Sequence, residues 1–306
     1  MKVGERHHEG SSFMKVSARF WGFAASLLGV GGWLLYYCSL AESCPWNAEK
    51  NEAICVVGIF KNEAMGIREW CQHYFDEGID QIFLIDNNST DDYKSQISQF
   101  GNKVVVVKDS KRHAQDELYN RHFLKKAKTF DWVIVVDLDE FLYSRSPWPT
   151  IKAYLANAPK KIGKITLLWK MFGSNKHDRQ PASIVKGFTK RQEFGPIQYN
   201  GKSITRGSAL IRISVHWAQA RGRILKLEAN DRSLNLNHYA IQSKEYFEKV
   251  KMRRGDVNSE LAENVRHWKY FRRYDWNEVD DYELAEKKGY DLGSAKDENV
   301  SSIDNN

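Results

Sequence analysis

A regular alternation of two sequence patterns between residues 53 and 136 limits this chain to one class of fold. Short runs rich in β-branched and aromatic residues predict buried strands at 53–60, 81–85, 103–107 and 132–136. The stretches between them carry apolar residues at helical spacing. Strands that alternate with helices predict an α/β domain, with a parallel sheet covered by helices on both faces.

Three helices are expected between these strands. The first has its apolar face at Ile67, Trp70, Cys71, Tyr74 and Phe75, and Gly78 ends it. A short second helix runs to about Phe100. The third is amphipathic and carries Tyr119, Phe123, Ala127 and Phe130.

Polar residues follow three of the predicted strands directly. They are Phe60-Lys61-Asn62-Glu63, then Asp86-Asn87-Asn88-Ser89, and finally Asp137-Leu138-Asp139-Glu140. Ligands of parallel α/β sheets bind at the carboxyl ends of the strands. The sequence therefore predicts that these groups converge on one edge of the sheet and form a binding site there.

The Asp-x-Asp pair is the most informative part of that edge. Asp137 and Asp139 offer hard oxygen ligands, which favour Mg²⁺ or Mn²⁺. A divalent ion at this place would hold a diphosphate. The chain contains neither a GxxxxGK[ST] loop nor a GxGxxG turn at a strand end, which fits a phosphate held by metal. The alternative is that Asp137 caps the next helix while Asp139 is solvated.

An uncharged segment near the N-terminus, residues 20–41, is long enough to cross a bilayer as a helix. Lys15 and Arg19 precede it, and Glu42 and Glu49 follow. This charge bias predicts a single-pass type II membrane protein with residues 1–19 in the cytoplasm. A cleaved signal peptide is the alternative, as is a cytoplasmic catalytic domain in a bacterial protein. Residues 42–52 are expected to form a polar stem.

Charge is unevenly distributed along the chain. Residues 145–274 hold 27 Lys and Arg against 9 Asp and Glu, whereas residues 275–306 hold 3 against 10. The basic part suits a phosphate-bearing ligand or an anionic membrane surface. Because no zinc-finger spacing, ribonucleoprotein signature or basic helix is present, we do not expect a nucleic-acid partner. From residue 286 to residue 306 the chain is a polar, acidic tail, and its end is expected to be disordered.

The segment from "VVGIFKNEAMGIREWCQHYFDEG" through "LIDNNSTDD" to "WVIVVDLDEFL" resembles the nucleotide-sugar domain of GT-A glycosyltransferases. The resemblance is to family 92 and the family 2-like group. It continues in "LLWKMFGSNKHD", "KSITRGSALIRISVHW", "LNHYAIQSKEYFEKVKMRRGD" and "WNEVDDYEL", and covers residues 53–285. It implies a catalytic domain with a nucleotide-sugar half, 53–145, and an acceptor half, 146–285.

The resemblance also implies roles for the residues that match the family pattern. Asn62 and Glu63, beside Phe60, border the nucleotide. Asp86, with Asn88 next to it, contacts uracil or ribose. Asp139 ligates the metal, and Asp137 contacts ribose or metal-bound water. A further metal ligand is expected from His216 or His238, with a slight preference for His216.

Two further roles remain open between several residues. Asp178 and Glu193 are the candidates for the general base that an inverting transferase needs near the acceptor hydroxyl. Either carboxylate can instead pair with a neighbouring Arg or Lys. Four basic residues are candidates for neutralising the diphosphate, although a solvated helix face explains the last three equally well: Arg206, Lys251, Arg253 and Arg254.

The sequence thus predicts a membrane-anchored glycosyltransferase that moves a sugar from a UDP-sugar to a glycan acceptor. The family resemblance points to galactose and to inversion. For a type II membrane protein of a eukaryote the expected compartment is the Golgi. A metal-dependent nucleotidyl- or phosphotransferase is a second hypothesis. A non-catalytic glycan-binding membrane protein is the third.

Overall fold

The structure, a computed structural model, describes residues 51–193, 200–254 and 266–290, and all of them belong to one compact unit, Ala48–Asn306. The predicted membrane anchor, residues 20–41, lies outside the described residues, as do residues 1–19, nearly all of the stem and most of the polar tail. Within the described ranges, we find no helix with both the length and the apolar character that a membrane span requires.

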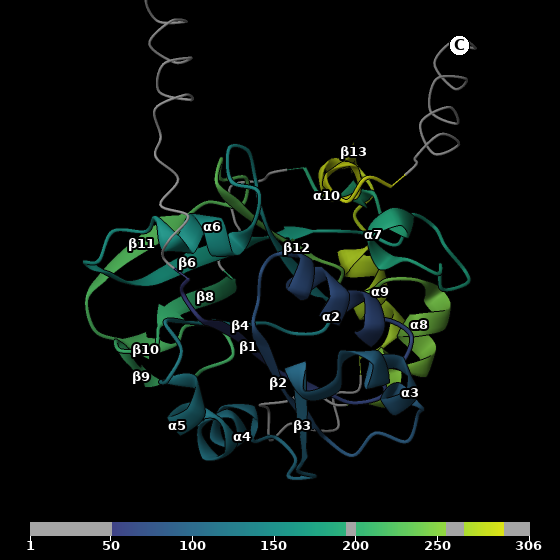
Figure 1. Cartoon of the computed structure of the whole chain (residues 1–306). Coiled ribbons are helices and arrows are strands. Elements are labelled where there is room, and N and C mark those ends of the chain that lie inside the picture. Colours follow the sequence, from purple (N-terminus) through teal and green to yellow (C-terminus); the bar gives the residue numbers. More distant parts are fainter. Residues whose placement is uncertain (1–50, 194–199, 255–265, 291–306) are drawn as a thin grey trace, which may run out of the picture. The chain divides into compact units, whose positions relative to one another are not determined.

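The first half of the sheet is the parallel unit that the sequence predicts. β1 (Ile54–Phe60) lies between β2 (Gln81–Asp86) and β4 (Trp132–Val135), and β3 (Val104–Lys108) pairs with β2. All four strands run in the same direction (Figure 1). The register places Phe60 beside Asp86, so the polar residues that follow β1 and β2 leave the sheet at the same edge.

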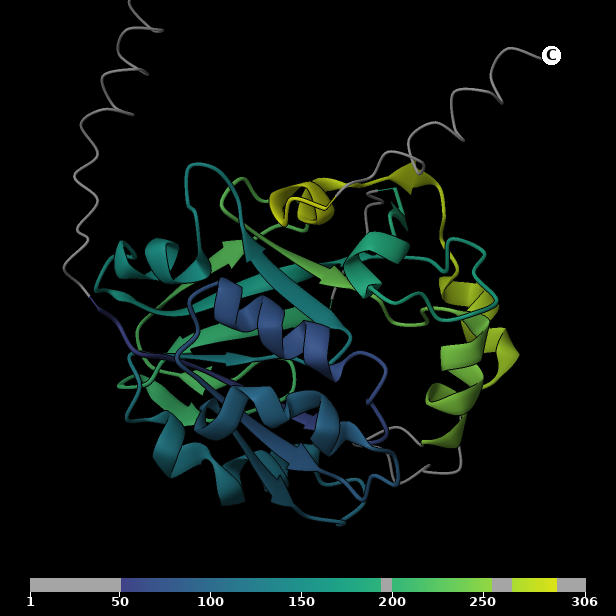
Figure 2. The ribbon, with the colours of Figure 1, turned by 45° about the vertical axis from the view of Figure 1, so that its right-hand side comes forward.

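Helices cover both faces of this unit, as the sequence predicts. α2 (Ile67–Asp76) and α3 (Tyr93–Ile97) pack on the face that includes Val56, while α4 (Gln115–His122) and α5 (Leu124–Ala127) pack on the face that includes Val57. Neighbouring strand residues point to opposite faces, which explains this division. Figure 2 shows α2 lying across the sheet.

Two of the predicted helices differ in detail. After α3 the chain continues as a 3₁₀ helix, η1 (Ser98–Lys103), before β3 begins at Val104. The third predicted helix is two short helices, because Phe123 has a φ of −124° and interrupts the helical backbone between α4 and α5. Phe130 lies beyond α5 but still packs against that side of the core.

The second half of the sheet is mixed. β8 (Gly201–Arg206) pairs antiparallel with β4, and β6 (Ile162–Met171) pairs antiparallel with β8. Next come β12 (Leu234–His238), parallel to β6, and β5 (Glu140–Ser144), antiparallel to β12. β11 (Arg223–Leu227) adds to β6. This strand order places His238 opposite Glu140, although the two residues are far apart in the sequence.

Short elements complete the described structure. They are α6 (Ile151–Ala156), α7 (Ile184–Gly187), β7 (Lys190–Arg191), β9 (Leu210–Arg212), β10 (Gln219–Ala220), α8 (Lys244–Lys249), η2 (Lys251–Arg253), α9 (Trp268–Tyr274), β13 (Val279–Asp280) and α10 (Glu283–Lys287). α8 and α9 lie side by side (Figures 1 and 2), with Phe247 against Trp268 and Phe271.

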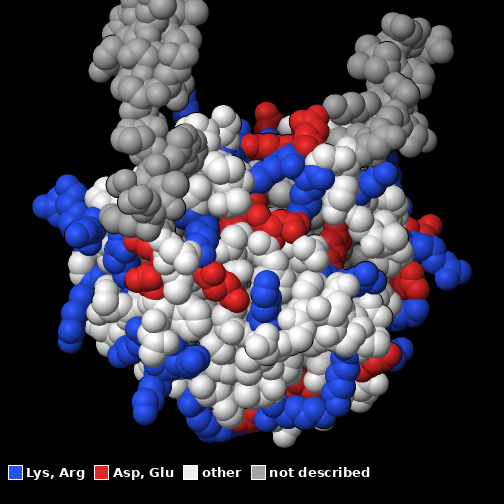
Figure 3. All heavy atoms as spheres, in the orientation of Figure 1, with Lys and Arg blue, Asp and Glu red and all other residues white. Residues whose placement is uncertain are grey.

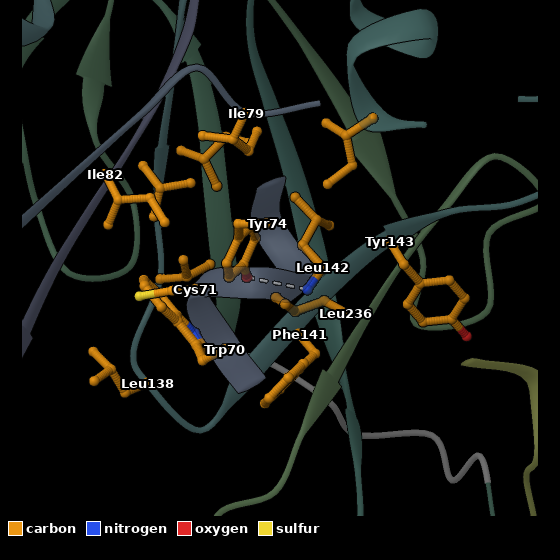
Figure 4. Packing of buried hydrophobic residues seen from close by; sticks show 14 of the residues in the cluster. Trp70, Cys71, Tyr74, Ile79, Ile82, Leu138, Phe141, Leu142, Tyr143 and Leu236 are labelled. Atoms are coloured by element: carbon orange, nitrogen blue, oxygen red, sulfur yellow. Dashed lines mark hydrogen bonds between the residues drawn. The ribbon is translucent and has the colours of Figure 1, made fainter. Parts of the chain in front are cut away.

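The loop with the Asp-x-Asp pair is fixed by the core beneath it. Leu138 is 3% exposed and packs in the same cluster as Trp70 and Phe141 (Figure 4). The Trp70 indole N–H donates to the carbonyl oxygens of residues 137 and 140, both at 3.0 Å. The Tyr74 hydroxyl donates to the carbonyl of residue 140 and accepts from Leu142 N. α2 therefore holds the acidic loop in place through buried hydrogen bonds.

Candidate active site

Asp137 follows β4 and is held by two side chains from other elements. Lys202 Nζ lies 2.7 Å from its Oδ2, and Gln115 Nε2 donates to its Oδ1 at 3.2 Å. Burial would raise the pKa of this carboxyl, but the Lys202 charge outweighs burial and lowers it. Its side chain remains 32% exposed. Asp137 is therefore an ionised carboxylate that solvent, or a ligand, can reach.

Asp139 is more deeply buried, and two other basic groups face it. Its Oδ2 forms an ion pair with the buried Lys251 ammonium from η2. Its Oδ1 lies 3.6 Å from His238 Nε2 on β12. Burial alone would raise the pKa of Asp139, but Lys251 and His238 hold it well below its usual range. The group is a carboxylate at all physiological pH values.

Glu140 completes the acidic run but points into the protein. It is fully buried, and its Oε2 accepts from Asp137 N at 2.8 Å and lies 3.4 Å from Lys202 Nζ. Burial raises its pKa well above the usual range, and the neighbouring Asp137 carboxylate adds to that shift. Glu140 thus supports the loop from within rather than facing a ligand.

The two candidate histidines occupy different positions. His238 faces Asp139, whereas His216 Nδ1 lies 3.1 Å from the carbonyl oxygen of Gly201 and forms no ion pair within the described ranges. The Trp169 ring lies between them, 4.4 Å from the His238 ring and 5.5 Å from the His216 ring. Burial lowers the pKa of both imidazoles, so both are neutral near pH 7. Of the two, His238 is the one placed to share an ion with Asp139.

The loops after β1 and β2 contact one another at this edge. Asn62 has a φ of +58°, and its side-chain oxygen accepts from Thr90 N at 2.7 Å. Asp86 is 2% exposed and accepts from Ser89 N and from the Tyr93 hydroxyl. Its carboxylate therefore orders its own loop in this structure. Its expected contact with uracil or ribose stays a prediction.

Two other residues of these loops are placed differently. The Phe60 ring is buried against Tyr93, with ring centres 4.7 Å apart. Asn88 is exposed and has a φ of +67°. Phe60 thus shapes the floor of the loop, and Asn88 presents its amide to solvent.

Glu63 links the β1 loop to the segment that carries Lys251. Its Oε2 accepts from the Tyr246 hydroxyl at 2.7 Å, and its Oε1 lies 2.5 Å from Arg254 Nη1. The carboxylate is 2% exposed. Both oxygens are thus occupied by α8 and by the residue that follows η2. The family resemblance implies that Glu63 borders the nucleotide, and this role stays a prediction; the structure adds the connection to α8 and η2.

Arg206 does not reach the acidic edge. It pairs with Trp132 at the start of β4, because β8 runs antiparallel to β4. Its guanidinium donates to the carbonyls of Ile162 and Ala158 and stacks on the Trp132 ring at 4.1 Å. These contacts lie at the opposite end of β4 from Asp137. The prediction that Arg206 contacts the diphosphate is therefore wrong. Arg206 instead stabilises the end of the sheet where β4 begins.

The two candidate bases are both exposed, but only Asp178 is paired with another described residue. Asp178 is 77% exposed and pairs with Lys244 at 2.7 Å. Glu193 follows Gln192, whose backbone N donates to Met171 O at the end of β6. The Glu193 carboxylate makes no hydrogen bond or ion pair with any described residue. It is therefore available on the side of the site where β6 ends.

Surface charge does not by itself mark the site. Figure 3 shows Lys and Arg spread over the visible face, with Asp and Glu among them. The cations that pair with Asp137 and Asp139 are two buried lysines, Lys202 and Lys251, each 1% exposed. Lysines are rarely buried without a paired acid. The role of Lys202 was not predicted from the sequence. The only signal for it was a single Lys inside the β-rich run "GKSITR".

Comparison with known proteins decides the family. The family model described as glycosyltransferase family 92 matches residues 50–284. The chain belongs to glycosyltransferase family 92. The matched range contains Asp137, Asp139 and both histidines. The resemblance recognised in the sequence motifs is thereby confirmed.

Curated family 92 proteins of plants are related to this chain at low identity. One from Ricinus communis is 26% identical over 219 residues, which is 67% of this chain and 38% of that protein. One from Oryza sativa subsp. japonica is 26% identical over 216 residues, 65% of this chain and 35% of that protein. The chain spans little more than a third of the length of these relatives.

Solved structures of two synthases align with part of this chain. Mannosyl-3-phosphoglycerate synthase from Rubrobacter xylanophilus shares 17% identity at a TM-score of 0.28, over 41% of this chain and 42% of that one. Glucosyl-3-phosphoglycerate synthase from Mycobacterium tuberculosis, solved with Mn²⁺ and UDP, shares 21% identity at a TM-score of 0.27, over 41% of this chain and 46% of that one. TM-scores this low do not establish a common fold.

Proposed function

We propose that this chain is a metal-dependent glycosyltransferase that uses a nucleoside-diphosphate sugar, expected to be a UDP-sugar, and a glycan acceptor. The observation that carries the proposal is the placement of Asp139 and His238 together at the carboxyl edge of the sheet, in a chain of family 92. The galactose donor and the inverting stereochemistry are part of the proposal and rest on the family resemblance.

In this proposal Asp139 and His238, which lie together at the edge of the sheet, hold the divalent ion. Asp139 Oδ1 and His238 Nε2 are 3.6 Å apart, against about 3 Å for adjacent ligands of an octahedral ion with bonds of about 2.1 Å. The described part of the chain holds no group of three or more His, Cys, Asp or Glu poised for a metal. Mg²⁺ and Mn²⁺ are commonly held by one or two protein ligands plus substrate phosphates, so two ligands suffice. When bound, the ion would supply positive charge to the departing diphosphate.

The remaining residues of the edge orient the donor in this proposal. Asp137 is ionised, partly exposed and fixed by Lys202, so it can accept hydrogen bonds from a ribose. The backbone of the Asn62 loop lies beside the same edge and would border the base. Trp169 contacts both imidazole rings, and His238 is the one that faces Asp139.

Glu193 is our candidate for the general base, in preference to Asp178. Its carboxylate has no partner among the described residues, whereas that of Asp178 is paired with Lys244. In an inverting transfer the acceptor hydroxyl oxygen bonds to the anomeric carbon as the bond from that carbon to the diphosphate breaks. The hydroxyl proton passes to the base, and the nucleoside diphosphate leaves with the bonding electrons.

The deciding experiment is hydrolysis of a panel of nucleotide sugars by residues 43–306, without acceptor, in Mn²⁺ or in chelator. We expect slow release of UDP from one donor, lost on chelation and in Asp139→Asn. Asp76→Asn is the matched control, because Asp76 is exposed on α2 and remote from the site. Release of UMP and a sugar phosphate instead would indicate a nucleotidyl- or phosphotransferase. Donor binding without turnover would leave a glycan-binding protein.

The membrane anchor at residues 20–41 remains a proposal of its own. Its support is the uncharged length of the segment and the charge bias around it. Carbonate extraction of membranes from cells that express the full chain tests it. An anchored chain stays in the pellet, and a cleaved or unanchored one is released.

A further inference from the structure

Three of the five large hydrophobic side chains that are exposed in the described part of the chain lie within one stretch, residues 211–224. They are Ile211, Trp217 and Ile224, with 46%, 37% and 50% of their surface exposed. The other two, Met65 and Val105, lie after β1 and in β3. Single exposed apolar residues are normal, but a group of them marks a contact surface.

The strand β11 points Ile224 away from one core cluster. Leu225 and Leu227 of this strand contribute to the cluster that includes Val56. Because neighbouring residues of a strand point to opposite faces, Ile224 and Lys226 lie on the other face of the sheet. This is the face on which α4 and α5 pack farther along the sheet.

The strands β9 and β10 lie over that same face, next to Ile224. Ala218, which directly precedes β10, packs in the cluster beneath α4 and α5. Lys164 of β6 is the sheet partner of Ile224, and its Nζ donates to Ala218 O at 3.0 Å. Trp217 therefore lies on the same side of the sheet as Ile224. Ile211 joins them from β9, which pairs with β10.

Cations surround these three side chains, and the sequence places no acid among them. Residues 194–227 contain six Lys and Arg and no Asp or Glu. Four of the six are exposed: Arg212, Arg221, Arg223 and Lys226. Within the ranges that the structure describes, none of these four forms an ion pair. Figure 3 shows Lys and Arg projecting from the left-hand side, where Figure 1 places the three strands.

We refer to the three apolar residues and the four cations together as the β9–β11 surface. Its combination of charge and apolar side chains suits a membrane that carries anionic lipids. Lys and Arg are attracted to such a surface, while Trp rings sit at the level of the headgroups and aliphatic side chains enter the acyl boundary. Single-stranded nucleic acid fits less well, because bases stack on aromatic rings and only one of the three apolar residues is aromatic.

The described chain enters the domain close to this surface. Asp131 N donates to Ala53 O at 2.8 Å, and Gly207 N donates to Asp131 O at 3.0 Å. Gly207 lies just before β9, and its carbonyl accepts from Leu210 N. An anchor that precedes residue 53 in the sequence is therefore joined to the domain beside β9.

We propose that the β9–β11 surface docks on the anionic lipid surface of a membrane. The cations contact lipid phosphates, and Ile211, Trp217 and Ile224 enter the headgroup region. This contact is separate from the acidic edge that carries the proposed chemistry, and it does not depend on the proposed function. Charge composition alone leaves the partner of the basic part open, and the exposed apolar residues favour a membrane at this place.

The test is cosedimentation of residues 43–306 with lipid vesicles. This chain keeps the whole compact unit, Ala48–Asn306, and lacks the proposed anchor, which would bind vesicles by itself. Vesicles of phosphatidylcholine are compared with vesicles of equal parts phosphatidylcholine and phosphatidylserine. We expect binding to the mixed vesicles that weakens as salt is raised, and little binding to phosphatidylcholine alone.

Two double variants separate the charged from the apolar part of the surface. Arg221→Ser with Arg223→Ser should weaken binding to the mixed vesicles about thirtyfold, since two cations near the lipid surface are lost. Ile211→Ser with Ile224→Ser should weaken it about tenfold, since less apolar surface enters the lipid. All four positions are exposed, so the fold should be retained, and the urea midpoint of each variant checks this.

The matched controls change exposed residues elsewhere. Arg68→Ser with Lys94→Ser removes two cations from α2 and α3, on the opposite face of the sheet, and Met65→Ser removes an exposed apolar side chain. We expect both controls to bind the mixed vesicles as the unmodified chain does.

Several results would overturn the proposal. The first is no binding to the mixed vesicles, or equal binding to phosphatidylcholine alone. A second is that the Arg68 and Lys94 control weakens binding as much as the Arg221 and Arg223 variant, because net charge then explains the effect. A third is that the two Ile changes have no effect. If a single-stranded oligonucleotide also displaces the chain from vesicles, the surface is a general site for polyanions.

Release of UDP from nucleotide sugars, measured on the same variants, keeps this inference apart from the proposed function. The β9–β11 surface lies outside the acidic edge, so UDP release without vesicles should be the same in all variants. Vesicle binding without UDP release would contradict the proposed function alone, and UDP release without vesicle binding would contradict this inference alone.

Discussion

Replacing Lys202 by Met tests whether the buried ion pairs hold the acidic edge together. The ammonium is 1% exposed, lies 2.7 Å from Asp137 Oδ2 and donates to Val215 O at 2.9 Å. Methionine keeps much of the apolar stem but removes the charge and the donor. Burial by itself would lower the pKa of Lys202, but the nearby Asp137 and Glu140 carboxylates outweigh burial and raise it. The folded structure therefore favours the charged form of Lys202.

The expected loss follows from the burial of both sides of the pair. Breaking a buried ion pair by removing one partner costs about 3–5 kcal/mol. Because the Asp137 side chain is 32% exposed, water compensates part of its charge, and we expect the lower value, about 3 kcal/mol. With a urea slope of about 3 kcal/mol/M, the midpoint falls by about 1 M.

The assay is urea denaturation of residues 43–306, followed by far-UV circular dichroism. Lys249→Met is the matched control: its exposed pair with Glu245 spans one helical turn, and we expect a loss of at most about 0.5 kcal/mol. In an Asp137→Asn background, Lys202→Met should cost clearly less, because the carboxylate that it neutralises is gone. A Lys202→Met midpoint equal to that of Lys249→Met would refute the reasoning.

Three further predictions concern the same edge. The pKa of Asp139 is lower in the folded protein than in the unfolded chain, where it is about 3.9. The carboxylate therefore contributes its full stabilisation above about pH 3.9, and this contribution is lost as the pH falls through the folded pKa. Urea midpoints measured between pH 6 and pH 2 should fall more steeply for the unmodified protein than for Asp139→Asn. Leu138→Ala should cost about 2–5 kcal/mol, against at most about 0.5 kcal/mol for the 40% exposed Met65→Ala, both measured by urea denaturation. Gly201→Ala should give insoluble or unfolded protein on expression, since a Cβ there would lie 1.7 Å from the carbonyl oxygen of Leu167.

Local patterns in the sequence determined the first half of the fold and the place of the site. β-Branched runs and helical spacing depend on neighbours within a few residues, and they correctly predicted β1 to β4 with helices on both faces. Because parallel strands end at one edge, the position of Asp137 and Asp139 there followed from the same patterns. Leu138 and Phe141, the apolar residues within and after the acidic run, are buried in the core and anchor the loop.

Only the tertiary structure decided which groups meet those acids. Lys202 is 65 residues from Asp137, and Lys251 is 112 residues from Asp139. Their contacts depend on strand order and register, which no local pattern encodes. The antiparallel direction of β8 sends Arg206 to the far end of the sheet while it brings Lys202 to Asp137. The pairing of β12 with β5 likewise brings His238, and not His216, to Asp139, because side chains on distant strands meet only where the register aligns them.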